Sequence, residues 1–228
     1  MRNPYISSEL FLFLKDLKAN NTRDWFNENK KRYIEVLRDP LLSMIEDFGP
    51  LLHSISPYFD ANAKTSGGSL FRIYRDVRFS ANKDPYKTHA GIHFRHSAGK
   101  DAHAPGYYLH LEPGNVFIAL GIWRPEMAVL SRIRNSIVSD PETWISITTD
   151  PSFSDTYDLE GDSLLRAPKG FDPDHPLIVD LRRKDFAGVC RLEQNDAEKV
   201  DFLEILADTW RKADRFMRYL TETTGHPF

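Results

Sequence analysis

The hydrophobic period changes along the sequence, and this change restricts the fold more than any other feature. From Leu10 to about residue 50, apolar residues recur at the spacing of an amphipathic helix. From Gly67 to Trp123 apolar and polar residues alternate, as they do in half-buried strands. The helical period returns at Pro125 and again from about Asp196. The sequence therefore predicts one α+β domain over residues 1–228, in which N-terminal and C-terminal helices pack on a sheet.

Helix ends are marked by local signals. Asn20–Asn21 stop the first predicted helix, and Thr22 can cap the second. Asp39 followed by Pro40 predicts the start of a third helix, which should end near Gly49–Pro50 or a turn later. The last helix should be long, from about Asp196. Its predicted apolar stripe consists of Val200, Leu203, Leu206, Trp210 and Met217.

Four segments carry the strand pattern. The first is Phe71–Phe79, and three more follow as "AGIHFRH", "GYYLHLEP" and "NVFIALGIW". The short link "EPGN" between the last two suits a hairpin. We expect an antiparallel sheet of about four or more strands over residues 69–123, and one or two further short strands in the loop-rich segment 161–181.

Composition excludes several classes of protein. The chain has 228 residues and a net charge of −3, so any basic patch must be local. Its one cysteine, Cys190, excludes an internal disulfide, suits a reducing cytoplasm and is expected to be a small buried side chain. The apolar run Leu10–Leu14 is too short for a signal sequence or a membrane span, so we expect a cytoplasmic protein that does not enter a membrane. No P-loop, dinucleotide-binding or nucleophile-elbow motif is present.

Several segments of the sequence resemble sequences of one protein family. They are "NNTRDWFNENKKRY", "FRIYRDVRFSANKDPYKTH", "GYYLHLEPGNVFIALGIWRPE" and "LLRAPKGFDPDHP", in that order. The chain resembles the domain of unknown function 2461 family, conserved hypothetical proteins of bacteria and fungi, from about Phe11 to the C-terminal helix. The resemblance implies a shared fold but no established activity. The strand before "IWRPE", expected to be rich in glycine, retains only Gly121.

The stretch from Phe71 to Arg95 concentrates cations among aromatic residues. On a regular strand Arg72, Tyr74, Asp76 and Arg78 would share one face, and arginine forks suit phosphate or carboxylate. We therefore hypothesise a concave anion site bordered by Arg72, Arg78 and Lys87. The predicted ligand-binding set from this stretch is Arg72, Arg75, Arg78, Lys83, Tyr86 and Lys87. The other interpretation is a solvated face whose arginines pair with carboxylates from helices.

Arg75 differs from the other members of this set in its predicted strand face. Strand parity places it with Ile73 and Val77 on the face that should meet the core. Because a buried unpaired charge is costly, we expect Arg75 to be buried or half-buried with a carboxylate partner.

Histidines supply the acid–base candidates. His89 and His93 are close in sequence, and His110 with Glu112 lies on a neighbouring predicted strand. A metal site needs three or four converging ligands, so we expect no metal and no other cofactor. Two further candidate groups are Trp123 with Arg124 at the end of a strand, and a loop group. The other interpretation of Trp123 is a side chain that seals an edge of the core. The loop group is Arg166, Lys169, Asp174 and His175, whose other interpretation is a surface crossover stiffened by prolines.

Two functions from different classes remain open. The first is a protein that binds a phosphorylated or carboxylated small molecule. The sequence does not establish whether such a protein is an enzyme. The second is a non-catalytic nucleic-acid-binding or interaction module that uses an aromatic sheet.

Overall fold

The computed structural model describes residues 3–98 and 105–228. Its centre is one antiparallel sheet with the strand order β1-β2-β3-β4-β6-β5. The strands are β1 (Phe59–Asp60), β2 (Ala90–His96), β3 (Gly106–Glu112), β4 (Asn115–Ile122), β5 (Asp158–Glu160) and β6 (Phe186–Leu192). The predicted α+β class and the antiparallel meander β2–β3–β4 are confirmed.

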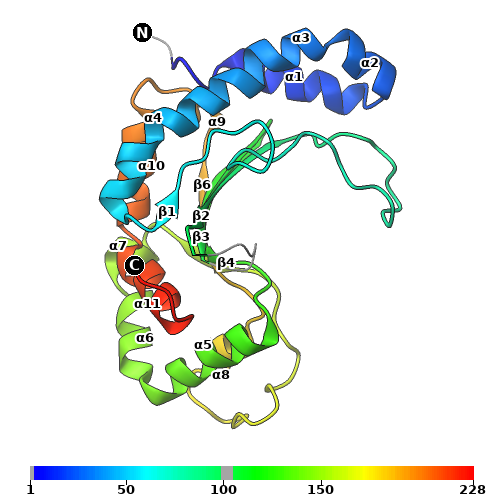
Figure 1. The fold of residues 1–228 in the computed structure, drawn as a ribbon. Helices are drawn as coiled ribbons and strands as arrows, with labels where there is room; N and C mark the ends of the chain where they lie inside the picture. Colours follow the sequence, from blue (N-terminus) through cyan, green and yellow to red (C-terminus); the bar gives the residue numbers. More distant parts are fainter. Residues whose placement is uncertain (1–2, 99–104) are drawn as a thin grey trace.

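Helices precede, interrupt and follow the strands. The first group is α1 (Ser8–Ala19), α2 (Arg23–Glu28), α3 (Lys30–Tyr33), the π-helical turn Ile34–Arg38 and α4 (Asp39–Ile55). The second is α5 (Met127–Ser139), α6 (Pro141–Thr148), α7 (Pro151–Ser154) and α8 (Ile178–Leu181), and the last is α9 (Gln194–Ala197), α10 (Phe202–Arg211) and α11 (Asp214–Thr223). In Figure 1, α4 and α10 lie along one side of the sheet.

Predicted helix signals in the N-terminal part are confirmed. The Thr22 hydroxyl accepts a hydrogen bond of 3.3 Å from the Trp25 N–H and so caps α2. Helix α4 begins at Asp39, with Pro40 in its first turn, and continues past Pro50 to Ile55. Two ends were predicted for this helix, Gly49–Pro50 or one turn later, and the later one is closer to the observed end at Ile55.

Part of the core lies between the sheet and the helices α4 and α10. Alternate strand residues such as Ile92, Phe94 and Tyr107 are fully buried on this face. The ring of Trp210 on α10 lies 4.8 Å from the ring of Tyr107 and 5.3 Å from that of Phe48 on α4. Burial of such large aromatic surfaces fixes α4 and α10 on the sheet.

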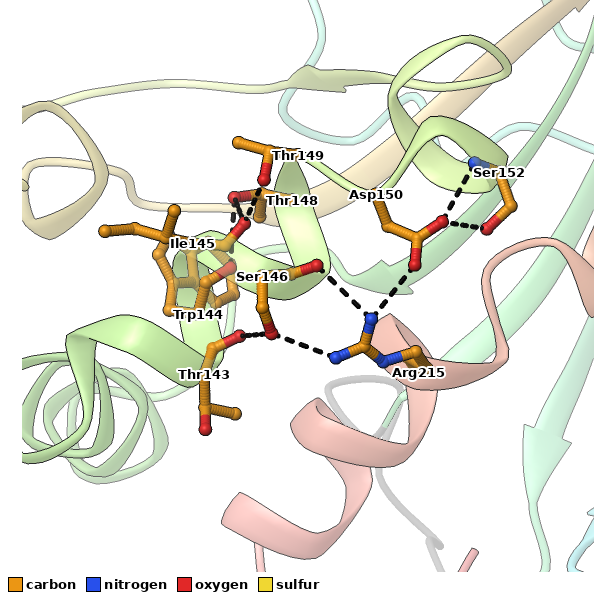
Figure 2. A network of polar contacts seen from close by, with 9 residues as sticks. All are labelled: Thr143, Trp144, Ile145, Ser146, Thr148, Thr149, Asp150, Ser152 and Arg215. Atoms are coloured by element: carbon orange, nitrogen blue, oxygen red, sulfur yellow. Dashed lines mark hydrogen bonds and ion pairs between the residues drawn. The ribbon is translucent and has the colours of Figure 1, made fainter.

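A polar network fixes α11 to the preceding helices (Figure 2). The Arg215 guanidinium donates to the Asp150 carboxylate at 2.9 Å and to the Ser146 hydroxyl at 2.9 Å. The same carboxylate accepts the N–H of Ser152 at the start of α7. One arginine therefore joins α11 to both α6 and the turn that leads into α7.

The prediction of a strand at Phe71–Phe79 is wrong. Only isolated bridges form there, Leu70 with Ile92 and Tyr74 with Tyr86. Residues 70–88, called the arm below, project from the sheet on the side away from α4 and α10 (Figure 1). The alternating segment folds back on itself: the Arg75 N–H bonds to the Pro85 carbonyl and the Lys87 N–H to the Ile73 carbonyl.

Two further expectations need correction. The C-terminal helix is broken into α9, α10 and α11, and Val200 between them is 55% exposed. The breaks let α10 pack on α4 while α11 packs on α5, α6 and β4, which one straight helix would not reach together. The second is the expectation of one or two short strands in residues 161–181, where the structure has an isolated bridge, Ser163 with Arg183, and the helix α8 but no strand. Strand β6 follows this segment and was not predicted, because its Phe186–Val189 run is buried throughout and shows no alternation.

Candidate ligand-binding pocket

The face of the sheet opposite the helices carries a pocket of about 630 Å³. Strand register shows which residues line it, because residues paired directly across strands share a face. One such row runs across four strands as His93, Tyr108, Ala119 and Val189. The pocket is within the size range of small-molecule sites in proteins.

Small side chains form the floor of the pocket. The central strands contribute Gly106 from β3, Ala119 and Gly121 from β4, and Ala187 from β6. Each lies on the open face, where flanking positions carry larger residues. The hollow therefore results from small residues at neighbouring positions of adjacent strands.

Aromatic rings form much of the wall. Phe71, at the base of the arm, has its ring centroid 6.0 Å from those of His93 and Tyr108, and Tyr108 lies 5.9 Å from Phe117. The Tyr108 side chain passes close to Gly91 of β2, where an added Cβ would come within 2.6 Å of the Tyr108 hydroxyl. Glycine at this position makes room for the wall.

Three arginines and one glutamate supply the charge of the pocket. Arg191 pairs with Glu160, and both are pocket-lining. Arg95 donates to His93 Nδ1 at 3.2 Å and lies over the Phe71 ring at 6.0 Å. In the part of the chain that the structure describes, neither Arg95 nor Arg124 forms an ion pair. Among the described lining residues, three arginines accompany one glutamate, so positive charge exceeds negative charge there.

The rim at Trp123 and Arg124 is held by a buried carboxylate. Arg124 has a φ of +49°, which non-glycine residues adopt uncommonly. Its N–H donates to Asp185 Oδ1 at 2.7 Å, and Asp185 Oδ2 accepts the Asp162 N–H at 2.8 Å. Asp185 is only 1% exposed. It thus joins the two loops that border the pocket, and Trp123 stays 54% exposed beside it.

His93 is a neutral donor at the pocket wall. Burial, with a smaller contribution from the Arg95 charge, lowers the pKa of His93 to about 4. Its Nδ1 accepts the Arg95 hydrogen bond, so in the neutral ring Nε2 carries the proton. His93 therefore cannot act as a general base through Nε2 in this state, but it can donate a hydrogen bond.

This assignment predicts a pH dependence of stability. The pKa of His93 is lower in the folded chain than in the unfolded one, so the unfolded state binds more protons between about pH 4 and pH 6.5. The free energy of unfolding should rise across this window and level off above it. The slope of unfolding free energy against pH is measured by urea denaturation at several pH values. His93→Gln should reduce this slope by the amount that corresponds to at most one bound proton. An unchanged slope would contradict the assignment.

A second polar cluster adjoins the pocket behind Tyr108. His110 Nδ1 lies 3.0 Å from the Tyr108 hydroxyl, and His110 Nε2 lies 3.5 Å from a Glu112 oxygen. The His110 ring stacks on His89 and on Phe117, at 4.5 Å in each case. Burial and the neighbouring His110 lower the pKa of His89 to about 4. These contacts fix the orientation of Tyr108 from behind.

The structure brings three of the predicted site residues into the pocket: His93, Trp123 and Arg124. Lys87 does not line the pocket but contacts one of its walls: Nζ lies 5.2 Å from the Phe71 ring and donates to the Arg72 carbonyl. His89 belongs to the adjoining cluster.

The other predicted residues do not line the pocket. Arg72 is exposed on the arm, Arg78 pairs with Asp76 at 2.7 Å, and Lys83 donates to the Val77 carbonyl. Tyr86 is buried, stacked at 4.1 Å on Phe26. Lys169 and His175 lie in the loop between β5 and α8, where His175 Nδ1 accepts the Leu177 N–H. The shared face proposed for Arg72 and Arg78 depended on a strand that does not form.

Arg75 follows its prediction in part. It is half-buried, as expected. Its contact is the Ser80 hydroxyl at 3.5 Å, and within residues 3–98 and 105–228 it has no carboxylate partner. The turn of the arm, rather than a packed helix, provides its environment.

Several pocket residues were not predicted: Phe71, Arg95, Tyr108, Phe117, Glu160 and Arg191. A signal existed for Arg95, since it alternates with His93 on β2 and must share its face. None existed for Arg191, because β6 had no strand pattern.

Other candidate chemistry is limited in the described residues. Within residues 3–98 and 105–228, no group of three or more His, Cys, Asp or Glu side chains could hold a metal ion. Cys190 is half-buried, and burial raises the pKa of its thiol. None of the described helices is long and apolar enough to cross a membrane.

Comparison with known proteins gives one match. The family model described as conserved hypothetical protein (DUF2461) matches residues 9–219. No curated protein and no solved structure matches the chain.

Proposed function

The chain belongs to the DUF2461 family of conserved hypothetical proteins, and we propose that it binds an anionic small molecule in the pocket on the open face of the sheet. The observation that carries the proposal is the charge of the lining: three guanidinium groups and one carboxylate around an apolar floor. Guanidinium forks bind phosphate or carboxylate in two-point contacts, and a partly desolvated setting strengthens them.

Arg95 and Arg124 lie at the same end of the pocket. Arg95 pairs with Gly106, which pairs with Gly121, and Arg124 follows Gly121 by three residues. Strands β2 and β4 are two strand spacings apart, roughly 10 Å. Long arginine side chains can therefore converge on one anion from both sides, with the His93 ring as a neutral donor beside Arg95.

Arg124→Gly should separate binding from stability. It removes a pocket cation, and it also places glycine where φ is positive, so the free energy of unfolding should stay equal or rise by up to about 1 kcal/mol. The dissociation constant for a phosphorylated or carboxylated ligand, found by thermal-shift screening and measured by calorimetry, should rise about tenfold or more.

The matched control is Arg166→Gly, an exposed arginine in the loop after β5 that does not line the pocket. Its affinity should equal that of the parent. Equal affinity for Arg124→Gly and the parent would count against the anion site.

A further inference from the structure

We infer that the ligand of this pocket is a nucleotide: a flat aromatic base joined to the anionic group that Arg95 and Arg124 bind. The inference rests on the proposed function and adds the part of the ligand that covers the floor. Shape, wall composition and the placement of charge each lead to it.

The floor of the pocket favours a ligand with a flat apolar surface. Gly106, Ala119 and Ala187 offer no side-chain hydrogen-bonding groups, and the backbone beneath them is paired within the sheet. Paired backbone groups have little capacity left for a ligand. The floor spans β3, β4 and β6, about 10 Å across two strand spacings, which is wide enough for a one- or two-ring base lying on its face.

The walls suit a ring as well. Tyr108 and Phe117 rise from neighbouring strands, and the half-exposed Trp123 stands at the rim next to Arg124. Stacking a base on an aromatic side chain contributes about 1–3 kcal/mol, whatever the base. An aliphatic phosphate would leave this aromatic surface in contact with water.

The charges lie at separate places on the lining. Arg95 on β2 and Glu160 on β5 lie at the two edges of one row of paired residues, which runs through Gly106, Gly121 and Ala187, and Glu160 is neutralised by Arg191. A ligand that is anionic throughout its length would meet Glu160. A nucleotide places its phosphate at the Arg95–Arg124 end and can present the N–H and carbonyl groups of its base to the Glu160–Arg191 pair.

The test compares compounds that contain the phosphate, the base or both. Calorimetry and thermal shift are run on the full chain with inorganic phosphate, ribose 5-phosphate, adenosine, the four ribonucleoside monophosphates and a ten-nucleotide single strand. At least one monophosphate should bind ten times more tightly than ribose 5-phosphate. Equal binding of ribose 5-phosphate and every monophosphate overturns the nucleotide inference and leaves the proposed function standing. Failure of every monophosphate to bind, while a carboxylated compound of the thermal-shift screen binds, has the same meaning. Failure of all phosphorylated and all carboxylated compounds to bind overturns both.

The single strand distinguishes the two sources of the same chemistry. Tighter binding of the ten-mer than of any monophosphate, with an affinity that falls steeply with salt, would identify a nucleotide within a nucleic acid. Equal or weaker binding of the ten-mer would identify a free nucleotide. Both outcomes support a base on the floor.

Variants of the floor check the location. Ala119→Leu fills the hollow without changing charge, so it should remove the tenfold preference for a monophosphate over ribose 5-phosphate. Ala119→Ser keeps the space and should retain it, with both variants first shown to unfold cooperatively. A preference that survives Ala119→Leu overturns the assignment of the base to this floor.

Discussion

Gly121→Ala is expected to lower the free energy of unfolding by about 3–5 kcal/mol, measured by chemical denaturation. Gly121 has a φ of +111°, a conformation that L side chains rarely adopt. An added Cβ would lie 2.1 Å from the Phe186 carbonyl oxygen, a backbone atom of the adjacent strand. Relief of this overlap requires β4 and β6 to separate at the pocket, so ligand binding should be lost as well.

Gly188→Ala is the matched control for this change. Gly188 lies on β6 with no positive φ, and its added Cβ would come within 3.3 Å of the Phe153 ring and 3.4 Å of Leu120. These are side-chain atoms that can shift, so the loss should be within about 1 kcal/mol. Equal losses for Gly121→Ala and Gly188→Ala would show that the backbone conformation at Gly121 is not the cause.

Asp185→Ala is expected to cost about 3–5 kcal/mol of unfolding free energy. The carboxylate accepts the N–H groups of Arg124 and Asp162, and hydrogen bonds to a charged group contribute about 1.5–3 kcal/mol each. Its loss leaves both donors without their acceptor and releases Arg124 from its positive φ. The rim should loosen, so ligand affinity should fall together with stability.

Asp162→Ala controls for the change in charge. The Asp162 side chain is exposed, and the bond that it supplies to Asp185 comes from its backbone N–H, which the substitution keeps. Stability and affinity should both stay close to those of the parent. If Asp162→Ala proves as damaging as Asp185→Ala, general electrostatics rather than the buried hydrogen bonds would explain the loss.

The sequence by itself determined the elements whose signals are local. Thr22 and Asp39–Pro40 mark helix starts, and alternation identified β2, β3 and β4, because caps and one-sided burial depend on residues a few positions apart. The same alternation placed His93 and Arg95 on one face.

Only the tertiary structure decided how these elements form a pocket. The segment Phe71–Phe79 has the pattern of a strand, yet its backbone bonds with its own returning half, so its arginines do not share a face on the sheet. Strand β6 brought Arg191 and Ala187 beside β4 across some 70 residues, and Asp185 joined two loops that are distant in sequence. Pairing between distant strands depends on the burial of the whole sheet and leaves no local pattern, which is why most of the pocket had to be found in three dimensions.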